Sequence, residues 1–171
     1  RKFQQNIQGA LANGIQVGVY FYSGASNARE AYDEASYCIS LIRDYQITYP
    51  VAFDWELDGD YDSVTEACET FCNVISSYGY QPMVYSNRNR WYNNFDGEKI
   101  ASKYKVWMAA YFGKFYYDSV RWTYGDEPPN FRYHYDMWQY SSRCYVDGIS
   151  GQVDVDIAFF GYANYHVDTK D

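Results

Sequence analysis

Hydrophobic residues are spaced along this chain in two different ways. Short apolar runs have the length of buried strands, at 16–22, 50–56, 81–86 and 105–111. Other stretches carry apolar residues three and four positions apart, which predicts helices at 3–13, 27–42 and 63–78. Because strands and helices take turns, the pattern predicts an α/β fold built on a parallel sheet.

Residues typical of helix ends stand at the edges of these stretches. Asn27 with Glu30, and Ser63 with Glu66, have the three-residue spacing of a capping box, so each pair predicts a helix start. Gly14 follows the first helical stretch, at the place where a left-handed C-cap is expected.

The alternation of strand-like and helix-like segments ends after residue 111. Residues 112–130 include glycines and a Pro-Pro pair, which predicts a long loop. Three later segments resemble short strands joined by turns, at 134–140, 145–146 and 152–157. The last third of the chain is therefore expected to be mostly β.

The strand at 50–56 ends in two acidic residues, Asp54 and Glu56, separated by Trp55. Side chains alternate along a strand, so Asp54 and Glu56 share one face and Trp55 points to the other. Same-face neighbours lie roughly 6.5–7 Å apart along a strand, close to the separation of carboxylate pairs that act on one glycosidic bond. An equally good interpretation is a strand that runs into a polar loop, since further aspartates follow directly.

Aromatic residues make up 22% of the chain, with 22 Tyr and 5 Trp. Flat amphipathic rings suit stacking against sugars, although tyrosine also fills cores and ordinary surfaces. The net charge of −8 and the lack of a basic run argue against nucleic acid as a partner. No apolar stretch approaches the length of a membrane span, so no membrane partner is expected.

Cysteine and histidine are scarce and poorly spaced for metal binding. Cys68 and Cys72 lie four residues apart in a helical stretch, whereas a zinc site needs spaced ligand pairs and usually histidine. Neither His134 nor His166 neighbours a cysteine pair, which also argues against a His-dependent hydrolase. No glycine-rich loop that cradles a phosphate occurs. We therefore expect buried free thiols, no metal and no organic cofactor.

Five motifs occur in order over nearly the whole chain. They are F-x-x-N-x-x-x-A-x-x-x-G-x-x-V-G-x-Y at 3–20, F-D-W-E at 53–56, G-Y-Q-P-M-V-Y-S at 79–86, V-W-M-A-A-Y at 106–111, and W-Q-Y-S at 138–141 with G-I-x-G-x-V-D-x-D at 148–156. Each motif is weak alone. Together they resemble the glycoside hydrolase family 25 lysozymes, the Chalaropsis-type N-acetylmuramidases.

The resemblance implies an irregular (β/α) TIM-like barrel whose final third is mostly β. It implies a catalytic domain over 1–163, incomplete at its N-terminal end, and the polar composition of 164–171 indicates a linker or tail. The implied reaction is hydrolysis of the β-1,4 bond between N-acetylmuramic acid and N-acetylglucosamine in bacterial peptidoglycan. The implied partner is the peptidoglycan glycan strand, met at the cell wall or outside the cell by a secreted autolysin or a phage endolysin. We expect the protein to be a monomer or one part of a multi-domain lysin.

The resemblance also implies roles for particular residues. Glu56 corresponds to the general acid, and a neighbouring carboxylate such as Asp54 favours the protonated form that this role needs. Two routes stay open. In one, a carboxylate acts as the nucleophile or stabilises the oxocarbenium-like state; in the other, the 2-acetamido group of the substrate attacks while Asp54 orients and stabilises it. Asp154 corresponds to a third carboxylate in the cleft, although a turn aspartate is the alternative. The expected substrate-binding residues, for which core packing is the alternative, are Tyr20, Tyr85, Trp107, Tyr111, Trp138 and Gln139.

Two departures from the family pattern stand out. The last motif commonly reads V-D-x-N, and here its fourth position is Asp156. The family's N-terminal strands, which carry an early aspartate, have no counterpart in this sequence, so we expect an upstream segment of roughly 30–50 residues, which would give a typical α/β-barrel length. The competing hypotheses are a non-catalytic glycan-binding domain on the same fold and a chitinase-like glycosidase.

Overall fold

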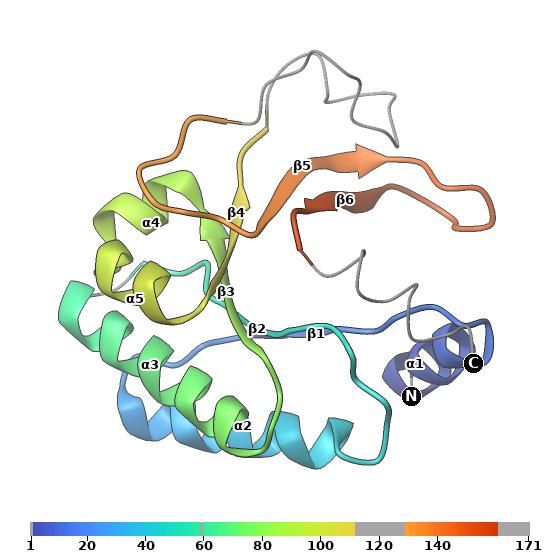
Figure 1. Cartoon of the computed structure of the whole chain (residues 1–171), viewed down its shortest axis with the longest axis horizontal. Helices are drawn as coiled ribbons and strands as arrows, with labels where there is room; N and C mark the ends of the chain where they lie inside the picture. The colour runs from blue at the N-terminus through green and yellow to red at the C-terminus, as the bar shows by residue number, and fades with distance from the viewer. Residues whose placement is uncertain (1, 59, 112–128, 161–171) are drawn as a thin grey trace. The chain divides into compact units, whose positions relative to one another are not determined.

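The computed structural model describes residues 2–58, 60–111 and 129–160, which fall into two compact units, 1–105 and 106–171. The first unit alternates helices and strands as the sequence predicts (Figure 1). Its elements are α1 (Lys2–Ala12), β1 (Val19–Tyr22), α2 (Ala28–Ile42), β2 (Val51–Asp54), α3 (Tyr61–Ser77), β3 (Pro82–Asn87), α4 (Arg88–Asn93) and α5 (Gly97–Lys103).

The sheet of the first unit is parallel, as predicted: β1 pairs with β2 and β2 with β3. Helices α2 and α3 lie side by side below these strands (Figure 1). Phe71 of α3 packs against Phe53 of β2 at 5.2 Å and Phe21 of β1 at 6.0 Å between ring centroids. The face of the sheet toward α3 is therefore the core of this unit. Side chains one position further along each strand point to the opposite face.

Two helix starts test the capping predictions. Asn27 caps α2 as expected, because its Oδ1 accepts a hydrogen bond from the Glu30 N–H at 3.0 Å. The prediction that α3 starts at Ser63 is wrong. Asp60 is the cap, and its Oδ2 accepts from the Ser63 N–H at 3.1 Å and from Ser63 Oγ at 2.7 Å. Gly14 has φ 72°, in agreement with its predicted left-handed C-cap position.

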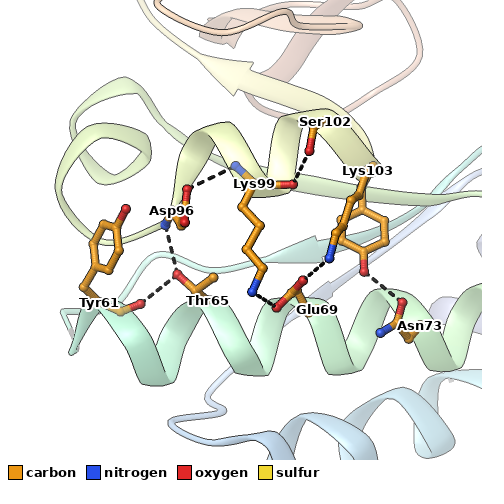
Figure 2. A network of polar contacts seen from close by, with 9 residues as sticks. Tyr61, Thr65, Glu69, Asn73, Asp96, Lys99, Ser102 and Lys103 are labelled. Atoms are coloured by element: carbon orange, nitrogen blue, oxygen red, sulfur yellow. Dashed lines mark hydrogen bonds and ion pairs between the residues drawn. The ribbon is translucent and has the colours of Figure 1, made fainter.

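A polar network joins α3 to the segment around α5 (Figure 2). Glu69 of α3 accepts hydrogen bonds from Lys99 Nζ at 2.7 Å and Lys103 Nζ at 2.6 Å. One turn earlier, Thr65 Oγ1 accepts from the Asp96 N–H at 2.9 Å and ties the N-cap of α5 to the same helix. Burial raises the pKa of Glu69, but the hydrogen bonds from the two lysines outweigh this and leave that pKa below its usual value.

Replacing Glu69 with Gln is expected to lower the free energy of unfolding by about 1 kcal/mol at neutral pH, since two partly exposed ion pairs are lost. The depressed pKa means that this stabilisation is present above the usual Glu pKa and disappears as pH falls through the folded-state value. Urea unfolding at pH 7 measures the loss of stability, and urea unfolding at about pH 3 measures how much of that loss disappears in acid. Asp44→Asn removes an exposed charge outside this network and is the control. Equal losses in the two variants at pH 7 would contradict the role of the network.

The second unit contains β4 (Lys105–Ala109, whose first residue closes the first unit), β5 (Met137–Cys144) and β6 (Val153–Ala158). β4 and β5 are parallel, and β5 and β6 are antiparallel. The predicted strand at 145–146 is wrong: the Ile149 N–H donates to Val146 O at 3.0 Å, and Gly148 has φ 89°, so this segment leads into a turn. Most of the predicted loop at 112–130 and the whole predicted linker at 164–171 lie outside the described residues.

Candidate active site

Asp54 is the last residue of β2, and it is 5% exposed. The strand register sets Asp54 beside Tyr22 of β1 and Tyr85 of β3. Trp55 lies on the core side, where its ring meets Phe95 at 5.6 Å. Glu56 follows just beyond the end of the strand and is half-buried; that its carboxyl group shares the face of Asp54 stays a prediction.

Two side chains hold the segment that carries Glu56. Ser86 Oγ donates to the Trp55 carbonyl oxygen at 2.7 Å, in a buried position. Arg90 Nε donates to the Leu57 carbonyl oxygen at 3.0 Å. Glu56 therefore sits between two anchored peptide groups, which restricts where its carboxyl can lie. The sequence offered no sign of either anchor, because each joins residues more than 30 positions apart.

The predicted sugar-binding tyrosines of the first unit have different surroundings. Tyr85 is 7% exposed and neighbours Asp54 in the register. Tyr20 is 64% exposed and lines a groove of about 720 Å³ between α1 and β1, as does Tyr22. Their face of the sheet is thus aromatic as well as acidic, a combination that suits a sugar ring.

In the second unit, Trp107, Gln139 and Asp156 share one face. Gln139 pairs with Asp156 across β5 and β6, and the Trp107 Nε1–H donates to Asp156 Oδ1 at 2.6 Å. Tyr111 OH lies 2.5 Å from Gln139 Oε1 and donates to it. Asp154, two residues before Asp156 on the same strand, is exposed. Four of the predicted site residues thus lie together with Asp156, which sequence reasoning noted only as a departure from a motif.

Trp138 does not lie with them. It is fully buried, its Nε1–H donates to the Ala110 carbonyl oxygen at 2.8 Å, and its ring packs on Tyr140 at 5.8 Å. The expectation that Trp138 stacks on sugar is therefore corrected: alternation along β5 turns it to the side opposite Gln139, into the core.

The charge state of Asp156 is unusual. The residue is exposed, yet protein atoms crowd its carboxyl group, and this partial desolvation raises the pKa to about 7. The hydrogen bond from Trp107 acts in the opposite direction, and the negative charge of Asp154 adds to the rise. The pKa of Asp156 is therefore raised from the usual aspartate range toward neutral pH.

Metal-ligating side chains do not gather in the described part of the chain: no three of its His, Cys, Asp and Glu residues are placed to hold an ion. All four cysteines are buried and free, as the sequence predicts. Burial raises the pKa of the Cys38 thiol to about 11, which makes it a poor nucleophile at neutral pH. No helix among residues 2–58, 60–111 and 129–160 has the length and apolar content needed to cross a membrane.

Residues 1–149 match the sequence profile of the glycosyl hydrolases family 25. The chain belongs to this family. The family 25 chain is 29% identical over 137 residues to the lysozyme of Streptococcus phage Cp-1, a match that covers 74% of the chain and 37% of that lysozyme. The expectation from the five motifs is confirmed.

Solved structures give the same fold. The CTP1L endolysin superposes with a TM-score of 0.75 at 23% identity, over 100% of this chain and 56% of that one. The modular autolysin LytC from Streptococcus pneumoniae, solved with a synthetic peptidoglycan ligand, superposes with a TM-score of 0.70 at 27% identity, over 91% of this chain and 37% of that one. The predicted fold class, an irregular TIM-like α/β barrel, is confirmed by these matches. This family 25 chain spans only part of the length of each of these relatives.

Proposed function

We propose that this chain is the catalytic part of a lysozyme that cleaves the β-1,4 bond between N-acetylmuramic acid and N-acetylglucosamine in peptidoglycan. One observation carries the proposal: in a family 25 chain, the anchored strand end of β2 bears buried Asp54 followed by half-buried Glu56. Two carboxyls at this spacing fit the acid and stabiliser roles of glycoside hydrolysis.

In the proposed mechanism, Glu56 protonates the glycosidic oxygen as the bond breaks. The sugar then carries positive charge, and the carboxylate of Asp54 stabilises it or orients the 2-acetamido group that attacks it. Asp154 supplies a further carboxylate. The fixed position of the Glu56 segment supports this assignment, because a general acid must lie within hydrogen-bond reach of the leaving oxygen. Tyr20, Tyr85, Trp107, Tyr111 and Gln139 bind the sugars in this proposal.

The glycan strands of the bacterial cell wall are the proposed partner, and the protein acts there as an autolysin or an endolysin. The peptidoglycan ligand of LytC and the name of the phage Cp-1 relative support this choice over chitin.

Clearing of a suspension of purified cell walls tests the proposed function. We expect turbidity to fall and new reducing ends of N-acetylmuramic acid to appear in step with it. Chitin is the control substrate and should stay intact. Clearing with new amino groups and no new reducing ends would mean peptide cleavage, and binding without clearing would mean a glycan-binding domain.

A further inference from the structure

Asp156 and Trp107 come from different strands of the second unit and meet through one hydrogen bond. The indole Nε1–H lies 2.6 Å from Asp156 Oδ1, across 49 positions of the sequence. The two residues do not sit in the same register row: Trp107 pairs with Met137, and Asp156 pairs with Gln139. The indole side chain of Trp107 therefore extends along the sheet toward Asp156, and the hydrogen bond fixes this orientation.

The surroundings of this pair suit a sugar. Trp107 is half-buried, and Tyr111 is 41% exposed, with its hydroxyl on the side-chain amide of Gln139. A flat ring beside hydroxyl, amide and carboxylate groups matches the apolar face and the hydroxyl rim of a pyranose. A sugar stacks well only on a ring whose plane is held still, since ordering a mobile side chain costs binding free energy.

We propose that Asp156 is a positioning residue, which holds the indole ring of Trp107 in place as a platform for a sugar ring of the substrate. It acts through Trp107 and not on the reacting bond. The proposal rests on the proposed function for the identity of the sugar. Its structural part, the control of the indole by Asp156, does not depend on that function.

Charged groups around the pair determine how the hydrogen bond between Trp107 and Asp156 depends on pH. Asp154 on β6 raises the pKa of Asp156, which lies near 7 mainly because of desolvation. On β5, Tyr140 feels the charge of Asp156 in turn, and on β4 Lys105 lies on the same side as Trp107. Above the midpoint Asp156 is charged and accepts a stronger hydrogen bond than its neutral form does below it. The indole is therefore held more firmly as pH rises.

The indole N–H signal of Trp107 tests the structural part without any substrate. In protein labelled with ¹⁵N-tryptophan, we expect this signal to shift with pH around a midpoint near 7. Asp156→Asn keeps an oxygen acceptor but cannot titrate, so the shift should vanish while the signal stays dispersed. A signal that titrates identically in the Asn variant, or not at all in the natural protein, would overturn the proposal.

Kinetics on soluble, uncrosslinked peptidoglycan strands test the sugar platform. Asp156→Ala is expected to raise KM about tenfold, with a smaller change in kcat, because an indole ring that is no longer held must be ordered when the sugar binds. Trp107→Ala should raise KM similarly, and the double variant should be no worse than Trp107→Ala alone. Additive losses, or an effect on kcat alone, would overturn the platform.

Asp147 is an exposed carboxylate in the turn between β5 and β6. The variant Asp147→Asn is the matched control and should leave KM unchanged. In the natural protein KM should fall as pH rises through about 7, and in Asp156→Asn this step should be absent. If walls and soluble strands resist the natural protein altogether, the proposed function fails, while the indole titration still decides the role of Asp156.

Discussion

Replacing Glu56 with Gln is expected to lower kcat for cell-wall hydrolysis by about 10²–10⁴-fold. The amide has the size and hydrogen-bonding shape of the carboxyl group but cannot transfer a proton to the leaving oxygen. Because Glu56 is only half-buried and its neighbours Trp55 and Leu57 are anchored through their backbone, the fold should tolerate the change. Release of reducing ends from purified walls measures the rate, and urea unfolding checks the fold.

Asp58→Asn is the matched control for this variant. Asp58 lies two residues further along, and its side chain is fully exposed. The kcat of this variant for wall hydrolysis should therefore stay within about twofold of that of the natural protein. An aryl glycoside with an acidic phenol leaving group offers a second check. Such a leaving group departs without a proton, so Glu56→Gln should lose far less activity on it. Wall hydrolysis at near natural rate in Glu56→Gln would exclude Glu56 as the acid.

The second large effect is expected on stability. Replacing Phe71 with Ala should lower the free energy of unfolding by about 3–5 kcal/mol. Phe71 is fully buried between α3 and the sheet, against Phe53 and Phe21, so truncation removes apolar contacts and leaves a cavity that rigid strands fill poorly. Urea unfolding, analysed through midpoint and slope, measures the loss.

Tyr32→Ala on α2 removes an aromatic ring that is 53% exposed and should change stability by about 0.5 kcal/mol or less. Phe71→Leu retains most of the buried volume and should lose less than Phe71→Ala. If the Ala variants at 32 and 71 were equally stable, the aromatic cluster would not be the core of the first unit.

Local periodicity in the sequence was enough to predict most elements of the first unit. The helices that form α1, α2 and α3 and the strands that form β1, β2 and β3 all appeared in the apolar spacing, because a helix or strand buries one face of its own local pattern. The exact first and last residues of these elements were predicted less accurately. The start of α3 was missed because Asp60, three residues before Ser63, is an equally good N-cap and accepts both hydrogen bonds from Ser63.

The motifs determined the family, and alternation within F-D-W-E predicted that Trp55 would point away from Asp54, to the face where it meets Phe95. The same alternation, applied along β5, would have separated Trp138 from Gln139. The motif alone did not do so, because aromatic residues serve both cores and sugar sites.

Tertiary structure alone decided which distant residues meet. Arg90 holds the Leu57 carbonyl across 33 positions, and Trp107 reaches Asp156 across 49. Sequence spacing carries information about neighbours along one helix or strand, whereas these contacts depend on how strands pair and how helices pack on them. The sequence by itself thus determined the family and predicted the acid pair of Asp54 and Glu56, which the Glu56→Gln variant tests. Only the fold decided what anchors the Glu56 segment and which carboxyl group holds Trp107.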